Sequence, residues 1–213
     1  SPQWAGDEVR VYHQDEHGMF GYFELWRRQV FNQWALDKGL MRGMLRHLLP
    51  LHVGETDQMT SVGDFGAGGG HYAQWLNETG LISAHAFDGS PGTQQLTEGR
   101  VREVNVVEEG LRLWRTFDWV LCLEVGEHIP NHFENNLLDN LKTHAELGMV
   151  MSWSSDVEGL GHVNCKSEEE FHRTVSARTG YLVDPVATKK LRDACEIDYI
   201  ARSVTVFRRP DKA

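Results

Sequence analysis

The chain has 213 residues, a length that suits one domain with or without an appendage. Its hydrophobic content of 40% is enough to build a full core. Its formal net charge of -10 disfavours a sequence-independent grip on nucleic acid, which needs clustered Lys and Arg, so we expect no nucleic-acid partner.

The three cysteines, Cys122, Cys165 and Cys195, are odd in number and have no CxxC spacing. They predict neither a disulfide framework nor a zinc cluster. No apolar run reaches about 18 residues, which predicts no membrane span. No signal peptide is visible, and together these features favour a cytoplasmic location.

Residues 1–50 are expected to form an N-terminal helical lid or cap. Between Phe20 and Leu49, apolar side chains recur at three-to-four spacing, which predicts two helices divided at Gly39. Packing of an aromatic stripe on the sheet explains most aromatics of this segment. Tyr12 and His13 precede the helical pattern, and we expect them to bind substrate as part of a lid.

A group of possible ligand side chains, His13, Asp15, Glu16 and His17, also lies in this segment. Its close spacing in an irregular stretch defines no coordination geometry, and we expect no metal site.

From residue 51 onward, short apolar runs alternate with helical patterns. This alternation predicts a doubly wound, mostly parallel α/β sheet with helices on both faces. The last run alternates in polarity, as an antiparallel strand near an edge would. The expected strands are 60–65, 84–88, 101–107, 117–123, 147–153 and 198–207. The expected helices are 71–79, 91–98, 131–145, 167–179 and 187–195.

A glycine-rich turn follows the first expected strand, in the sequence SVGDFGAGGG of residues 61–70. Glycines allow positive φ angles and let a backbone approach a nucleotide-like ligand closely. Taken alone, such a turn is as often structural as functional. In a doubly wound sheet the ligand lies at the carboxyl ends of the strands, so we look there for further signals.

The second and third expected strands end in polar residues that can hydrogen-bond a nucleotide-like ligand. Asp88 lies about 20 residues beyond the glycines, where a carboxylate can accept hydrogen bonds from ribose hydroxyls. The alternative is a turn residue in Asp-Gly-Ser-Pro. Asn105 can bond an adenine edge while Val106 packs on the ring, or Asn105 is simply a loop residue.

The fourth expected strand ends in a cluster of ionisable groups, within FDWVLCLEVGEHIP. Glu124 closes the strand, and Glu127 and His128 precede a new helix. Two carboxylates and an imidazole at this edge suit the meeting point of substrate and cofactor. Alternatively, Glu127 and His128 only begin the helix, where acidic groups favour the dipole.

Together, DFGAGGG, Asp88 and EVGEHIP resemble class I S-adenosylmethionine-dependent methyltransferases of the small-molecule type. The resemblance implies a Rossmann-like, seven-stranded sheet with one antiparallel strand, in a domain spanning 51–213. It implies S-adenosylmethionine as cofactor and S-adenosylhomocysteine as product. The residues that would contact the cofactor are Asp64, Gly66, Ala67, Gly68, Gly70, Asp88, Asn105, Val106 and Glu124.

A further motif, WSSDVEGLGHVN, follows the fifth expected strand and resembles a subgroup of these enzymes. It lies where substrate is expected, so Trp153 and Asn164 are candidates to bind the acceptor. His162 is a candidate base or substrate ligand. Alternatively, His162 and Asn164 cap the next helix and bond the backbone.

The expected reaction moves a methyl group to an O, N or S nucleophile of a small-molecule metabolite. An alcohol or protonated amine must lose a proton, and the candidate catalytic residues are His128, His162 and Glu127. An acceptor that is already ionised needs no base. Methylation of a protein or peptide side chain, and a degenerate cofactor-binding regulatory subunit, stay as alternatives. The oligomeric state is not predicted.

Overall fold

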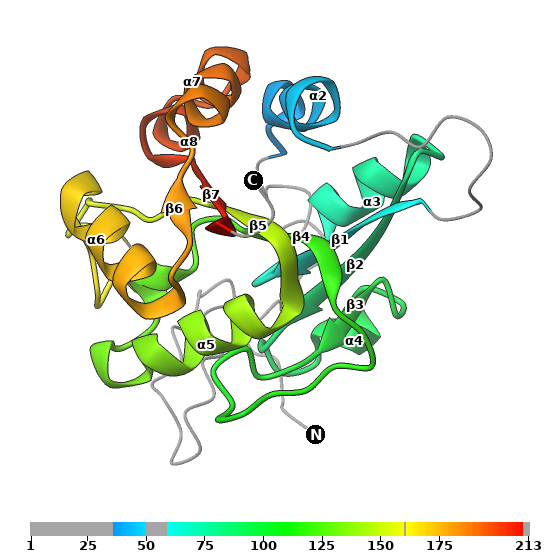
Figure 1. The fold of residues 1–213 in the computed structure, drawn as a ribbon. Coiled ribbons are helices and arrows are strands. Elements are labelled where there is room, and N and C mark those ends of the chain that lie inside the picture. The colour runs from blue at the N-terminus through cyan, green and yellow to red at the C-terminus, as the bar shows by residue number, and fades with distance from the viewer. Residues whose placement is uncertain (1–35, 50–58, 160, 211–213) are drawn as a thin grey trace.

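The computed structural model describes residues 36–49, 59–159 and 161–210, and within them seven strands form one sheet (Figure 1). The strand order is β3-β2-β1-β4-β5-β7-β6. Most of the expected lid lies outside the described residues. This includes Tyr12, His13 and the other possible ligand side chains, Asp15, Glu16 and His17. The strands are β1 (Thr60–Phe65), β2 (Ile82–Asp88), β3 (Val101–Glu103), β4 (Phe117–Cys122), β5 (Ala145–Met151), β6 (Leu182–Val183) and β7 (Thr205–Arg208).

The sheet is mostly parallel. β1 pairs in parallel with β2 and β4, β2 pairs with β3, and β4 pairs with β5, whereas β7 runs antiparallel to β5 and β6. This arrangement confirms the predicted doubly wound fold with one antiparallel strand, β7, which lies next to the edge strand β6. The strand order reverses between β1 and β4, so the ligand-binding crevice of such a sheet is expected above their carboxyl ends.

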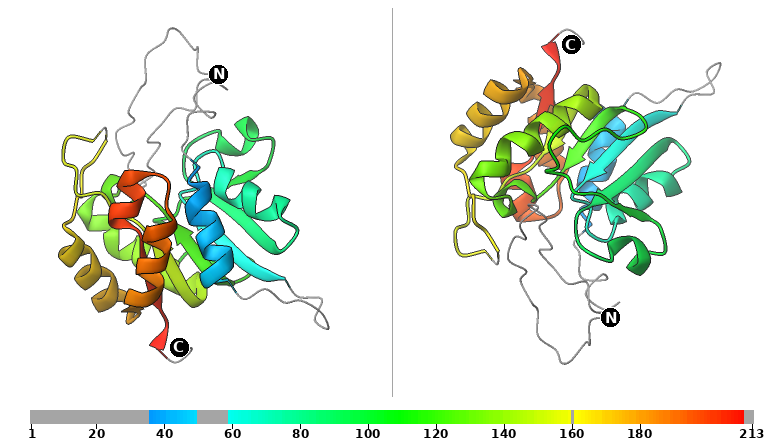
Figure 2. Two further views of the ribbon diagram at one scale, coloured as in Figure 1. Left: turned by 90° about the horizontal axis from the view of Figure 1, so that it is seen from above. Right: turned by 90° about the horizontal axis from the view of Figure 1, so that it is seen from below.

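Helices cover both faces of the sheet (Figures 1 and 2). One apolar core lies between the sheet and α2, α3, α7 and α8, and the other lies between the sheet and α5 and α6. The helices are α2 (Lys38–His47), α3 (His71–Glu78), α4 (Thr93–Leu96), α5 (Glu134–His144), α6 (Glu168–Thr179), α7 (Pro185–Ala194) and α8 (Asp198–Ser203).

Asp37 fastens the first described helix to the C-terminal part of the chain. Its fully buried carboxylate caps α2 by accepting a hydrogen bond from Leu40 N at 2.8 Å. The same carboxylate accepts bonds from the backbone N–H groups of Glu196 and Ile197 at 2.9–3.0 Å. Because one side chain satisfies donors from both ends of the chain, α2 docks beside α7 and α8.

Two predictions about this region were wrong. Gly39 does not divide two helices but lies in the first turn of α2, where a Cβ would collide with the backbone carbonyl of Ala194. Residues 198–203 form α8 rather than the start of a strand, because Ile200 packs into the core at helical spacing from Ile197 and Val204. Gly39 is therefore explained by close packing of α2 against Ala194 and not by a break between two helices.

Smaller differences concern element lengths. The third strand stops at Glu103, because Asn105 and Glu108 close a turn through a 3.1 Å backbone hydrogen bond. The helix expected over 91–98 is a single turn, α4, and the short edge strand β6 was not predicted.

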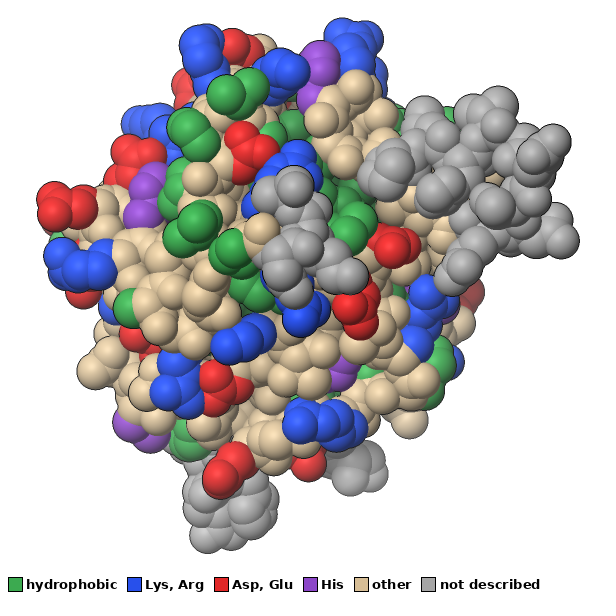
Figure 3. Space-filling model, in the orientation of Figure 1, with side chains coloured by type: hydrophobic (Ala, Val, Ile, Leu, Met, Phe, Trp, Pro, Cys, Tyr) green, Lys and Arg blue, Asp and Glu red, His purple; other side chains and the backbone are tan. Residues whose placement is uncertain are grey.

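Among the described residues, no helix has the length and apolar character needed to cross a membrane. The face drawn in Figure 3 intersperses acidic and basic side chains rather than collecting one sign of charge.

Candidate functional site

The glycine turn lies at the carboxyl end of β1, against the end of β2. The N–H groups of Gly66 and Ala67 both donate to the carbonyl of Phe87, at 2.8 and 3.0 Å. Gly66, Gly68 and Gly70 have φ angles of 76°, 53° and 73°. This left-handed backbone is costly for other residues, so the predicted reason for the glycines applies at these three positions.

Asp88 and Gly68 form one hydrogen-bonded unit. Oδ2 of Asp88 accepts a 2.7 Å bond from Gly68 N, and Oδ1 accepts a 2.8 Å bond from Ser90 N. Asp88 is only 8% exposed, so its carboxylate is held in one orientation at the mouth of the turn. Each carboxylate oxygen has a second lone pair, with which it can accept a bond from a ligand hydroxyl.

Asp64 lies beneath this unit rather than on its surface. Burial raises the pKa of Asp64 to about 7, and the nearby Asp88 carboxylate adds to the effect. Its Oδ2 has no hydrogen-bond partner within the described structure. Asp64 is buried within β1, just before the turn, so we expect any effect on a ligand to pass through the backbone.

Asn105 and Val106 follow β3, at the neighbouring position of the same edge. The Asn105 side chain accepts a 3.2 Å bond from Val107 N, which fits the turn interpretation, and its amide NH₂ group is still able to donate. Val106 is buried, and its carbonyl accepts a 2.9 Å bond from Asn140.

Glu124 has a strained backbone at the end of β4, with a φ of 54°. Its N–H donates to the hydroxyl of Ser152 at 2.8 Å, and its carboxylate accepts from the hydroxyl of Ser203 at 3.3 Å. Burial raises the pKa of Glu124. The backbone of Glu124 is thus held beside the end of β5, and its carboxyl group is directed to α8.

Glu127 and His128 converge with His162, although α5 and β5 lie between them in sequence. A carboxylate oxygen of Glu127 and one ring nitrogen of each histidine lie within 4.8 Å of one another. The two rings meet edge to face, with their centroids 4.8 Å apart. The structure thus brings together all three predicted catalytic residues. It also makes them a set of potential metal ligands, which we had not expected.

Burial governs the ionisation of this cluster. It raises the pKa of Glu127 well above its usual range, and the adjacent Glu124 carboxylate raises it further. Burial lowers the pKa of His128 to about 4, so its ring is neutral at neutral pH. Glu127 and His128 therefore both favour their uncharged forms.

The two predicted substrate residues of the described chain have structural contacts. Trp153 is buried, donates its indole N–H to the carbonyl of Asn164 at 2.7 Å, and also borders the cavity described next. The Asn164 side chain donates to Glu134 at 2.8 Å. Asn164 therefore orders the loop that carries His162.

A cavity of 690 Å³ opens beside the cluster, over the ends of β4 and β5. Its lining mixes aromatic, acidic and basic groups, which suits a polar small molecule with an apolar portion. Residues that line it include Glu124, Trp153, Ser154, Asp156, His162, Lys166, Tyr199, Arg202 and Ser203.

Sequence reasoning missed several of these residues. Three of them, Tyr199, Arg202 and Ser203, belong to α8. Because we had expected a strand there, we did not predict that these side chains would line a site. Lys166 is buried and pairs with Glu134 at 2.9 Å, a contact across the chain that no local motif reveals. The helical spacing of Ile197, Ile200 and Val204 was the available signal for α8.

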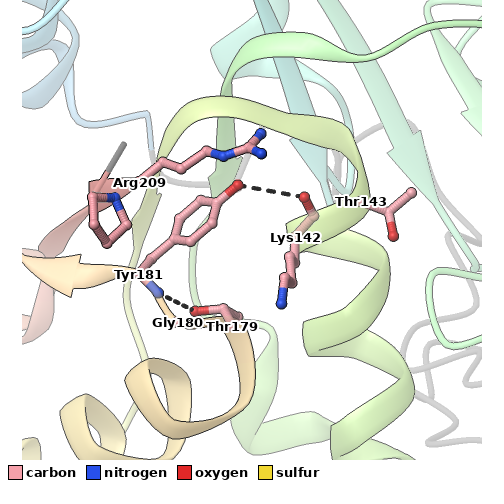
Figure 4. Close-up of a pocket in the computed structure, with 7 residues that line it drawn as sticks. Lys142, Thr143, Thr179, Gly180, Tyr181 and Arg209 are labelled. Carbon is pink, nitrogen blue, oxygen red and sulfur yellow. Dashed lines mark hydrogen bonds between the residues drawn. The ribbon is translucent and has the colours of Figure 1, made fainter. Parts of the chain in front are cut away.

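A second cavity of 420 Å³ lies near the opposite end of β5, between the ends of α5 and α6 and the segment after β7 (Figure 4). Tyr181 points across it and donates to the carbonyl of Ala145 at 2.6 Å. This cavity lies away from the glycine turn and contains none of the predicted site residues.

Comparison with known protein families matches residues 40–178 to the family described as the methyltransferase domain. The chain belongs to this family. The match covers more than half of the methyltransferase chain and includes the glycine turn, Asp88 and the Glu127–His128 cluster. It confirms the resemblance predicted from those motifs. No curated protein matches the chain.

Solved structures share the fold of this methyltransferase at low sequence identity. The sugar N-methyltransferase KedS8 from Streptoalloteichus sp ATCC 53650 has a TM-score of 0.59 and 15% identity, with 98% of this chain and 99% of that chain covered. Magnesium protoporphyrin IX methyltransferase from Synechocystis PCC 6803, with bound SAH, has a TM-score of 0.56 and 13% identity, covering 84% and 80%.

A third structure, a 1,6-didemethyltoxoflavin-N1-methyltransferase from Burkholderia thailandensis, has a TM-score of 0.55 and 18% identity, covering 85% and 81% of the two chains. At these identities the similarity shows the fold alone, so the roles of this methyltransferase's residues must be argued from its own geometry.

Proposed function

We propose that this chain is an S-adenosylmethionine-dependent methyltransferase that acts on an O, N or S nucleophile of a small-molecule metabolite. The observation that carries the proposal is the unit of Gly68 and Asp88. It presents an oriented carboxylate at the end of β2, beside a left-handed glycine turn that follows β1 and so borders the point where the strand order reverses.

The residues at this point fit the cofactor. Asp88 can accept the ribose hydroxyls, Asn105 and Val106 border the adenine position, and the turn itself carries no lysine or arginine for a phosphate. A Cβ at Gly66 would collide with Val125, so the turn lies tightly against the segment after β4. When bound, the cofactor supplies a sulfonium-activated methyl group that a nucleophile displaces in line.

The chain's own residues would mainly bind and align the two reactants, because proximity can supply most of the acceleration in such a displacement. The 690 Å³ cavity borders Glu124 and His162, which favours this end of the sheet as the acceptor site. His128 and His162 are the candidates for handling an acceptor proton, with Glu127 beside them. Tyr12 and His13 stay predicted lid residues.

Titration calorimetry with S-adenosylmethionine and S-adenosylhomocysteine tests the proposal. We expect both to bind the wild-type protein and neither to bind Gly68→Arg, because arginine is strained at positive φ and fills the space of the turn. Failure of the wild-type protein to bind either compound would contradict the proposal and its cofactor-binding alternatives.

The nature of the acceptor requires a separate measurement. Release of S-adenosylhomocysteine would be followed with a panel of small alcohols, amines, thiols and carboxylates, and in parallel with peptide pools. Turnover with a small acceptor supports the proposal. Turnover with peptides alone would favour the protein-methylating alternative, and cofactor binding without turnover would favour a regulatory subunit.

A further inference from the structure

We propose that Glu127, His128 and His162 bind one divalent transition-metal ion beside the acceptor cavity. One oxygen of Glu127 and one nitrogen of each ring lie within 4.8 Å of one another. His162 also lines the cavity, so an ion held by these groups would lie at its wall. The ion and its ligands go beyond the proposed function, which assigns no metal.

The environment of Glu127 gives the first reason. Glu127 is 0% exposed, its carboxylate oxygens meet no donor of good hydrogen-bond geometry within the described structure, and the Glu124 carboxyl lies beside it. Glu134 is also buried, but its carboxylate is paired with Lys166 at 2.9 Å and accepts a bond from Asn164 at 2.8 Å. A buried carboxylate without such partners is costly, and a cation would offset that cost.

The orientation of the imidazole rings gives the second reason. Nδ1 of His128 lies 3.1 Å from the carbonyl oxygen of Gly161, and Nδ1 of His162 lies 2.5 Å from that of Asp156. Because a carbonyl only accepts, each ring donates from Nδ1 and carries its lone pair on Nε2. Metal-binding histidines are commonly oriented by a backbone carbonyl in this way.

The backbone supplies the third reason, by holding the two halves of the site together. The N–H groups of Val163 and Asn164 both donate to the carbonyl of Glu127, at 2.8 and 2.9 Å. A Cβ at Gly159 would collide with the His162 ring, so this glycine makes room for the ring. His162 is therefore held against Glu127 independently of the side chains that would bind the ion.

The ligand set indicates the kind of ion. One carboxylate and two imidazoles suit Zn²⁺, Mn²⁺ or Co²⁺ better than Mg²⁺ or Ca²⁺, which prefer oxygen ligands. Bonds of about 2.1 Å place neighbouring ligand atoms about 3 to 3.5 Å apart, so the most widely separated ligand atoms must approach by about 1.5 Å. Three protein ligands leave positions open toward the cavity, as in catalytic rather than structural sites.

An open coordination position deepens the proposed function and rests on it. A hydroxyl acceptor bound to the ion would release its proton to water at a lower pH than a free hydroxyl. His128 and His162 would then act as ligands rather than as bases. The inference favours acceptors with a hydroxyl oxygen that can reach the ion.

Metal titration tests the site directly. The full chain, dialysed against EDTA and then against metal-free buffer, would be titrated with ZnCl₂ and MnCl₂, and the retained metal measured by mass spectrometry. We expect one equivalent per chain. Glu127→Gln and His162→Ala should bind at least about 10-fold more weakly, whereas His132→Ala, which removes an exposed histidine from the same region, should bind as wild type.

Two further measurements keep the outcomes distinct. Far-UV circular dichroism must show that Glu127→Gln is folded, and this near-isosteric change keeps the backbone carbonyl that holds the loop. Co²⁺ should give visible absorption bands in the wild-type protein and not in Glu127→Gln. Less than about 0.2 equivalents of metal, or equal affinity in wild type, Glu127→Gln and His162→Ala, would overturn the site.

Binding of S-adenosylmethionine to the metal-free protein separates this proposal from the previous one. One metal equivalent without cofactor binding would leave the metal site standing and remove the proposed function. Cofactor binding without metal binding would support the proposed function and remove the metal site.

Discussion

At the scale of single residues, the site depends on carboxyl groups whose surroundings differ. Asp88 is satisfied by two backbone donors, whereas Asp64 and Glu127 are buried with unpartnered oxygens. Environment rather than residue type thus separates a carboxylate prepared to accept ligand hydroxyls from carboxyls that favour the protonated form.

Removing the Asp88 carboxylate should weaken cofactor binding. We expect Asp88→Ala to lower the affinity for S-adenosylhomocysteine by about 10- to 100-fold, the usual worth of hydrogen bonds to a charged group. Titration calorimetry would measure it. Asp193→Ala, which removes an exposed aspartate of α7, is the control and should bind as wild type. Unchanged affinity in Asp88→Ala would remove this residue from the site.

Asp64 should make stability depend on pH. Its folded pKa of about 7 exceeds the ordinary aspartate value of 3.8, so the folded state binds its proton more tightly than the unfolded state. The stability from this group is full below pH 3.8 and is lost as the pH rises through about 7. The loss is of order 4 kcal/mol, at about 1.4 kcal/mol per unit.

Urea unfolding of wild type and Asp64→Asn between pH 5 and pH 8 measures this effect. The variant lacks the titrating group, so the stability of wild type relative to the variant should fall across that range. A constant difference would show that Asp64 keeps the same pKa in both states.

At the scale of elements, the docking of α2 on α7 depends on a close approach. Gly39 lies against the carbonyl of Ala194, and a Cβ at Gly43 would meet the Cβ of Ala194 at 2.9 Å. Neither approach leaves room for a larger side chain. Two small positions one turn apart thus let the two helices pack closely.

This packing reverses the usual effect of a glycine substitution. In an exposed helix interior, Gly→Ala stabilises by about 1 kcal/mol. We expect Gly39→Ala to destabilise instead, by about 1–3 kcal/mol, because the added methyl collides with backbone. Denaturant unfolding would measure the change, with Arg46→Ala on the exposed side of α2 as the control. A stabilised Gly39→Ala would contradict the packing argument.

Sequence reasoning succeeded where the signal is local. The glycine turn, Asp88 and EVGEHIP each follow a strand, so their shared edge could be inferred from topology. It failed for α8 and Gly39, whose roles depend on contacts with distant parts of the chain. The sequence suggested only that Glu127 and His162 lie at the same edge of the sheet. Their contact is made by two backbone hydrogen bonds between segments that α5 and β5 separate in sequence.

At the scale of the whole molecule, ligand binding should appear as added stability. A ligand at 100 times its dissociation constant stabilises the folded state by about 2.7 kcal/mol. For a chain of this size that corresponds to a rise in melting temperature of roughly 5–10 °C. We expect this rise with S-adenosylhomocysteine and none with Gly68→Arg, as measured by scanning calorimetry. An equal rise in both proteins would place the ligand elsewhere.

The carbonyl of Glu127, which accepts bonds from Val163 N and Asn164 N, has a consequence for amide hydrogen exchange. Exposed loops normally exchange their amide protons quickly. Here two consecutive amides of a loop are held by an acceptor from another segment, so their exchange reports on separation of the two segments. Slow exchange at Val163 and Asn164, within an otherwise fast loop, would measure how often the loop that carries His162 separates from Glu127.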